Sequence, residues 1–130
     1  MINSKFEFTF IFHKFILEVT RFRQFRDEKM DFDKTLLEAV DCALLALGES
    51  PRKAIYYHLN KSFKLQKEDI PEDTDKFSDA LNTLFGPGAE VIEKLIVKNL
   101  YRKLNLNFEE NARFEIDDCI SLAREAAKRK

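Results

Sequence analysis

The chain has 130 residues, of which 45% are hydrophobic and 35% are charged. This composition excludes a disordered or membrane-spanning protein and predicts one globular domain with its own core. Lys and Arg number 22 against 23 Asp and Glu, and this balance disfavours broad nucleic-acid binding, which depends on neutralising phosphates.

Residues 1–29 hold seven of the thirteen phenylalanines. Some of their apolar residues repeat with the four-three spacing of a helix face: Phe8, Phe12, Phe15, Val19 and Phe22. The alternation from Phe6 to Phe12 would also suit a strand, but no second strand is predicted to pair with it. We therefore expect a helix over about residues 10–29. Charged residues interrupt the run, so it is predicted to be neither an export signal nor a membrane anchor.

Two interpretations of residues 1–29 remain open. If they belong to the natural protein, their phenylalanines have to be covered by the bundle or by a second copy of the chain, and we expect a homodimer through this segment. Alternatively the segment is not native, because Met30 directly precedes the well-patterned part of the chain and would be its start. The expected organisation is thus this segment, a helical domain over residues 30–105 and a C-terminal helix within 106–130.

The first two helices of that domain are expected at about residues 33–47 and 50–63. The predicted inward stripe of the first consists of Leu36, Leu37, Val40, Ala43, Leu44 and Leu47. Gly48 would end it, and Ser50 followed by Pro51 would begin the second as an N-cap and first helical residue. The inward face predicted for the second consists of Ala54, Ile55, Tyr57 or His58, Leu59 and Phe63. Cys42 and Cys119 lie within helical patterns and are predicted to be small core residues in a reducing, cytoplasmic setting.

Residues 65–71 are predicted to form a connector, followed by helices over about residues 73–85, 89–104 and 116–128. Asp73 would cap the first of these, and the Gly86-Pro87-Gly88 run would end it. Its predicted core side consists of Phe77, Leu81, Leu84 and Phe85. In the next helix, Glu90 and Glu93 stand near the start and basic residues near the end, as the helix dipole favours. The sequence therefore predicts an all-α, single-domain bundle of five to six short helices.

Within residues 33–104 the chain resembles a small archaeal all-helical family, sometimes described as the Nitrosopumilus output domain. The resembling segments are Leu47-Gly48-Glu49-Ser50, the run from Lys53 to Leu59, Ile70-Pro71, Phe77 with Ala80-Leu81, the run from Phe85 to Ala89, Ile92 to Ile96, and Leu100-Tyr101. The resemblance implies an archaeal cytoplasmic protein or signalling output module whose biochemical role is undefined. It implies no catalytic residues, cofactor or metal.

The start of the second predicted helix carries a candidate anion or partner contact. It consists of Ser50, Arg52, Lys53, Tyr56, Tyr57 and His58. A helix N-terminus with cations attracts anions, but no glycine-rich loop precedes this one, so an ordinary cap is the favoured interpretation. Three consecutive aromatic residues point in different directions, and at least one has to face outward as a contact residue. His58 lacks a second ligand or carboxylate at metal-site spacing.

Lys94, Lys98 and Arg102 recur every four residues and form a candidate nucleic-acid stripe, although Glu90 already offers Lys94 a partner. The sequence shows no nucleophile–base pair, metal-ligand set or phosphate loop. We therefore expect a non-enzymatic protein-interaction or signal-transduction output domain that binds an unidentified protein partner. The alternative is a helix-turn-helix-like module that binds nucleic acid.

Overall fold

The computed structural model describes residues 31–109 and 114–129, which contain five α-helices and no strand. Residues 31–46 form the first described helix, and α2 (Glu49–Phe63) follows it. A short 3-10 helix, η1 (Lys67–Glu72), leads into α3 (Thr74–Phe85), and the single turn η2 (Gly86–Gly88) leads into α4 (Ala89–Lys103). The last helix is α5 (Ile116–Lys128). The predicted all-α class is thereby confirmed, whereas the expected helix over residues 10–29 lies outside the described residues.

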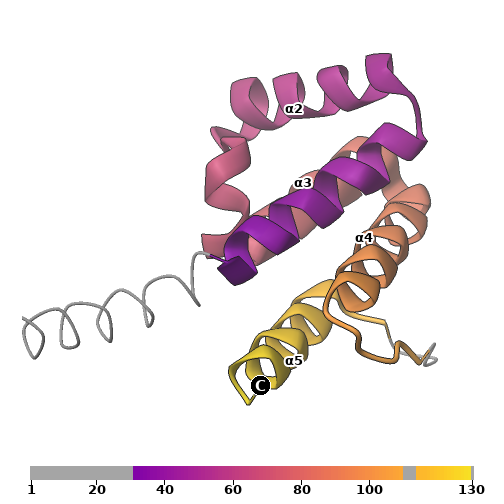
Figure 1. The fold of residues 1–130 in the computed structure, drawn as a ribbon. Coiled ribbons are helices and arrows are strands. Elements are labelled where there is room, and N and C mark those ends of the chain that lie inside the picture. The colour runs from indigo at the N-terminus through magenta and orange to yellow at the C-terminus, as the bar shows by residue number, and fades with distance from the viewer. Residues whose placement is uncertain (1–30, 110–113, 130) are drawn as a thin grey trace, which may run out of the picture. The chain divides into compact units, whose positions relative to one another are not determined.

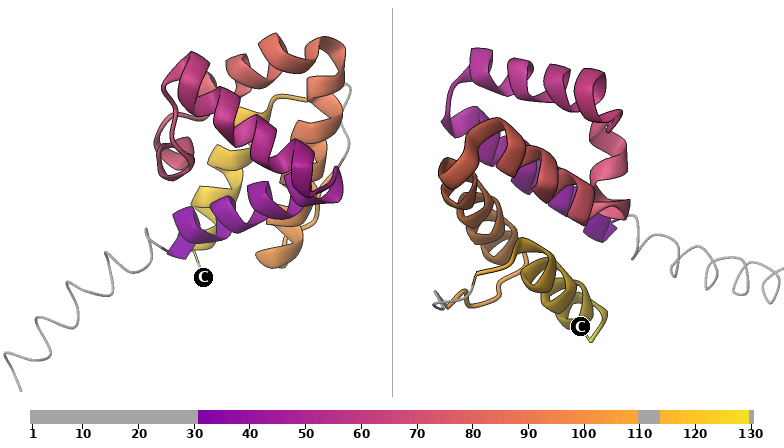
Figure 2. Two further views of the ribbon diagram at one scale, coloured as in Figure 1. Left: turned by 90° about the horizontal axis from the view of Figure 1, so that it is seen from above. Right: turned by 180° about the vertical axis from the view of Figure 1, so that it is seen from behind.

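From Phe32 onward the described residues form one compact unit. The helix of residues 31–46 and α3 occupy the middle level of this unit, with α2 on one side and α4 and α5 on the other (Figure 1; Figure 2, right). α3 contacts α2, η1, α4 and α5. Its Phe77 is fully buried with Leu36, Leu44, Leu81 and Ile96. Packing around α3 therefore joins all of the helices in one hydrophobic core.

The predicted boundaries of α3 to α5 agree with the structure within one residue. The Asp73 side chain caps α3 by accepting a hydrogen bond from the Lys76 backbone N–H at 3.3 Å. The start of α2 differs from the prediction, because Gly48 is its N-cap and the Ser50 side chain makes no capping bond. Gly48 has a φ of 121°, where side chains are strained, and it turns the chain so that the helix starts at Glu49. Pro51 still falls in the first turn, where a missing N–H costs nothing.

The inward face of α2 also differs from the prediction. Ile55 and Leu59 are buried, but Tyr57 is 57% exposed and both Ala54 and His58 are exposed. Tyr56 is the half-buried aromatic residue instead. The reason is a polar contact, described below, that draws the Tyr56 hydroxyl toward Asp41 on the preceding helix.

Several residues assigned to the core from their spacing lie at its edge. Leu47 is 44% exposed and Phe85 is 38% exposed, because both stand at helix ends where no further helix covers them. Cys42 is exposed and Cys119 is half-buried, and both are free thiols, so the prediction of two core cysteines is wrong for Cys42. The predicted connector after Leu65 contains the η1 turn, whose Ile70 and Pro71 are buried.

One charged residue lies in the core. Glu93 stands near the start of α4, as the sequence indicates, and its exposed fraction is only 6%. Its carboxylate accepts a hydrogen bond of 2.8 Å from the Ser78 hydroxyl on α3. Burial raises the pKa of Glu93, and the bond from Ser78 opposes that rise.

Polar contacts fasten α5 to the rest of the unit. The Arg124 guanidinium donates to Asp33 at 3.0 Å and lies 4.5 Å from the centre of the Phe32 ring. The Tyr101 hydroxyl on α4 donates to the Cys119 carbonyl at 2.8 Å. The C-terminal helix therefore belongs to the same folded unit as the four helices before it.

Candidate functional site

Among the described residues, an apolar groove lies between the first three turns of α2 and the end of α3. It has a volume of about 310 Å³. Its lining residues are Leu47, Pro51, Ala54, Ile55, His58, Leu84 and Phe85. This volume is at the small end of the range for ligand pockets, about 300–1,000 Å³, and suits one or two large side chains better than a bulky cofactor.

The groove exists because the helix of residues 31–46 and α3 both end beside α2, and no further apolar side chains from the described part of the chain cover their last residues. Gly48 ends the chain's course along the first helix and leaves Leu47 at the edge, and Gly86, with a φ of 56°, does the same for Phe85 at the end of α3. The third side is the face of α2 that carries Pro51, Ala54 and His58. Exposed apolar side chains gathered around a concavity are typical of binding surfaces rather than of ordinary protein surface.

Spacing alone assigned Leu47, Leu84 and Phe85 to the core, so the groove was missed in the sequence. The useful signal was present, because Leu47 and Phe85 are each the last apolar residue of a helix, directly before a glycine. A residue in that position completes the periodic stripe but reaches beyond the neighbouring helix, and only the lengths and crossing of the helices show this.

His58 is the one titratable side chain among the residues that line the groove. Its ring meets the Tyr57 ring edge-on, with centroids 5.5 Å apart. The Lys61 ammonium donates to the Tyr57 hydroxyl at 3.1 Å and lies 5.4 Å from the centre of that ring. The consecutive residues Tyr57 and His58 thus both face outward, and Tyr57 holds a cation one turn beyond the groove.

The remaining residues of the predicted anion contact are drawn into contacts within the chain. Arg52 donates to Asp41 at 2.8 Å, the Tyr56 hydroxyl donates to the same carboxylate oxygen at 3.1 Å, and Lys67 approaches it at 3.5 Å. Lys53 lies 3.6 Å from Glu49. Ser50 is exposed on the first turn of α2. The structure therefore does not bring these groups together around an open anion position.

The Asp41 cluster perturbs the acidity of its members. Burial raises the pKa of Asp41, but the hydrogen bonds from Arg52 and Tyr56 and the charge of Lys67 outweigh burial and hold the pKa below its usual range. Burial and the adjacent Asp41 charge raise the pKa of Tyr56 well above its usual range, so its hydroxyl remains a donor. This cluster links three consecutive elements and is a structural contact rather than a reactive one.

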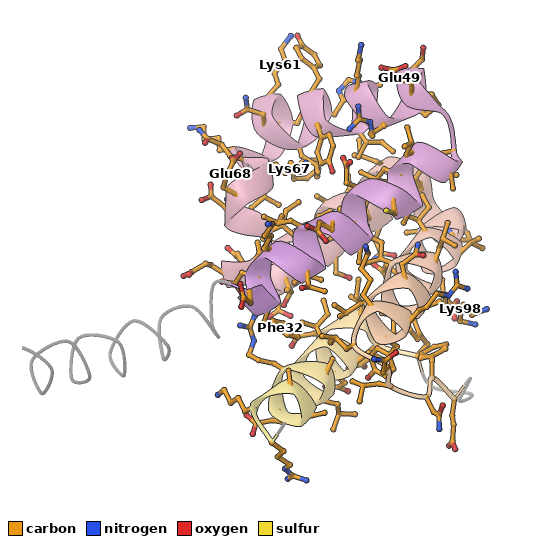
Figure 3. All side chains as sticks on the ribbon, in the orientation of Figure 1. Phe32, Glu49, Lys61, Lys67, Glu68 and Lys98 are labelled. Atoms are coloured by element: carbon orange, nitrogen blue, oxygen red, sulfur yellow. The ribbon has the colours of Figure 1, made fainter. Side chains whose placement is uncertain are left out.

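The three members of the predicted nucleic-acid stripe do not form a uniform cationic surface. Lys94 is half-buried, lies 3.4 Å from Glu90 and stands 5.8 Å from the centre of the Phe114 ring. Lys98 and Arg102 are exposed on α4, and Figure 3 shows Lys98 on the outer side of the unit. The neighbouring Lys103 lies 3.7 Å from Glu38. Acidic partners on the same surface therefore reduce the attraction that this stripe would exert on phosphates.

Acidic residues gather at the start of α3, where the Thr74 hydroxyl donates to Asp117 on α5. The charge of Asp117, followed by burial, raises the pKa of Asp75. Within residues 31–109 and 114–129, however, no three or more His, Cys, Asp or Glu side chains are placed to hold a metal ion. Over the same residues, no helix has the length and apolar character needed to cross a membrane.

Comparison of the chain with protein-family models, with curated proteins and with solved structures finds no match. The resemblance to the archaeal output-domain family therefore stays a prediction. The groove between α2 and α3 is left as the candidate site, on its geometry alone.

Proposed function

We propose that this protein is a non-enzymatic protein-interaction domain that binds a segment of a partner protein in the groove between α2 and the end of α3. The observation that carries the proposal is the apolar concavity itself, whose edge exposes Leu47 and Phe85. Burying such side chains against a partner contributes about 25 cal/mol per Å² of apolar surface removed from water. An apolar groove of this kind is the usual receptor for the apolar face of an amphipathic helix.

The chemistry of the groove supports binding rather than catalysis. Enzyme active sites typically combine two or more reactive groups within hydrogen-bonding reach of each other. The lining residues supply one, His58, whose nearest ring neighbour is Tyr57. The role in signal output, in an archaeal cytoplasm, rests on the family resemblance alone and is proposed as such.

A groove variant tests this function in the full chain. Ala54 is an exposed residue of the groove wall, so Ala54→Gln places a polar side chain in the groove without disturbing the core. Because glutamine is nearly as good a helix former as alanine, the fold should persist. The matched control is Asn60→Gln, an exposed position on the opposite side of α2. Each protein would be immobilised and exposed to a lysate of the organism that encodes it, and the captured proteins quantified.

We expect at least one protein that the wild type and Asn60→Gln capture equally and that Ala54→Gln captures roughly tenfold less, because a buried amide without a partner opposes binding. Capture that is insensitive to Ala54→Gln would contradict the proposal. Recovery of nucleic acid alone would also contradict it and would favour the helix-turn-helix-like alternative.

A further inference from the structure

Charges around the groove are unequally distributed between its two walls. The α2 wall continues into Lys61, which contacts the Tyr57 hydroxyl and ring and, within the described part of the chain, has no carboxylate partner. Lys53 stands seven residues before Asn60 and therefore on the opposite side of α2 from the groove, where it shares an exposed pair with Glu49 at 3.6 Å.

On the opposite wall, at the end of α3, the exposed polar side chains next to the lining residues carry no charge. Asn82 and Thr83 are the exposed polar residues beside Leu84 and Phe85. Both turn their side chains back to their own helix, where Asn82 donates to the Ser78 carbonyl and Thr83 to the Asp79 carbonyl, each at 2.9 Å. Lys61 is therefore the charged group that a segment lying along this face of α2 would meet.

The groove and Lys61 lie on one line of the α2 surface. Ala54, His58 and Lys61 occupy positions i, i+4 and i+7, which share one face of a helix. At 1.5 Å per residue, Lys61 stands about 10 Å along the axis from Ala54. Figure 3 shows Glu49 and Lys61 toward opposite ends of α2, with Lys61 directed away from the helices beneath. A segment that lies along α2 with an apolar side chain in the groove would pass beside this ammonium group.

We propose that the groove recognises a helical segment of the partner that inserts a large apolar side chain between α2 and the end of α3 and places carboxylates about two turns away, against Lys61. This inference rests on the proposed function and specifies the chemistry of the partner. The apolar side chain supplies most of the affinity, and the carboxylates select the direction in which the segment lies. A basic segment with the same apolar residues is disfavoured by repulsion from Lys61.

Two synthetic peptides of about 15 residues, long enough to form helix on binding, provide the test. Both carry the same leucine and phenylalanine four residues apart on one face, and they differ only in having glutamates or lysines two turns from that pair. Their affinity for the full chain would be measured by fluorescence anisotropy. The variants are Lys61→Glu and, as a control with the same change of net charge, Arg102→Glu near the end of α4.

We expect the acidic peptide to bind the wild type more tightly than the basic peptide does. The ratio of the two affinities should fall about fivefold in Lys61→Glu, since each exposed charge pair is weak but the variant replaces attraction by repulsion. Arg102→Glu should keep the wild-type ratio. High salt should reduce the ratio toward one, because the Debye length falls to about 3 Å at 1 M salt.

The inference is overturned if the two peptides bind with equal affinity, if Lys61→Glu leaves their ratio unchanged, or if neither peptide binds. Each of these results leaves the proposed function to its own experiment, the loss of captured protein in Ala54→Gln. If Ala54→Gln captures as much protein as the wild type while Lys61→Glu abolishes the preference for the acidic peptide, the contact is purely electrostatic. That combination would contradict both proposals.

Discussion

Two adjacent leucines of the first described helix offer a sharp test of the fold, because they differ in burial and in little else. Leu44 is completely buried, whereas Leu45 is 49% exposed. Replacing Leu44 by alanine removes buried methyl groups and leaves a cavity that its neighbours cannot fill, at a cost of about 3 kcal/mol. Replacing Leu45 leaves a space that water fills, so only part of the transfer free energy is lost, and the better helix propensity of alanine offsets some of it. We expect a loss below about 1 kcal/mol.

The measurement is urea-induced unfolding of the full chain, followed by far-ultraviolet circular dichroism and repeated at two protein concentrations. Thermal unfolding followed by the same signal gives a second measure. For a unit of this size each 1 kcal/mol of unfolding free energy corresponds to about 4–8 °C in melting temperature, so Leu44→Ala should melt roughly 15 °C below the wild type. Similar losses for Leu44→Ala and Leu45→Ala would refute the assigned face of this helix. A loss for Leu45→Ala that grows with protein concentration would show that a second copy covers that leucine.

Two carboxylates should give opposite dependences of stability on pH. Burial raises the folded-state pKa of Glu93, so this residue favours the folded state below the unfolded value of about 4.3 and loses that contribution as pH rises through the folded value. The unfolding free energy of Glu93→Gln should therefore equal that of the wild type near pH 4 and exceed it by about 1 kcal/mol at pH 7. A lower unfolding free energy of Glu93→Gln at pH 7 would mean that the Ser78 hydrogen bond outweighs burial. Asp41 has a lowered folded-state pKa, so its contribution is present above about 3.9 and disappears as pH falls through the folded value. Asp41→Asn should be less stable than the wild type at pH 7 and approach it in acid, and a constant difference across pH would contradict the assigned role of the charge.

The positions of the helices after Gly48 could be predicted because their start and stop signals are local. Asp73 caps α3, and the Gly86-Pro87-Gly88 turn separates α3 from α4, as expected from residue type alone. A glycine with a positive φ or a capping carboxylate acts within one turn of chain. The misplaced start of α2 has a similar origin, since Gly48 and Ser50 are both good N-caps and their neighbours in sequence do not choose between them.

The burial of individual polar and aromatic side chains could not be predicted in the same way. Tyr56, Tyr57 and His58 have comparable apolar character, and which one turns inward depends on Asp41, fifteen residues before Tyr56. Glu93 stands on the apolar stripe of α4, four residues after Ala89 and three before Ile96, and its buried carboxylate has a donor in Ser78 on α3. Both outcomes depend on contacts between one helix and the next, fifteen residues apart in sequence and so beyond the reach of local signals.

The sequence by itself determined that the described chain is all-helical and where most of the helices end, because apolar periodicity, glycine, proline and capping residues act through neighbours within one or two turns. Only the tertiary structure decided that Leu47 and Phe85 line a groove instead of the core, and that Lys61 stands beside that groove with a tyrosine for its contact. A helical stripe specifies the side that faces inward, but the length and crossing of neighbouring helices set how far along the stripe burial extends. The candidate site lies where that burial stops.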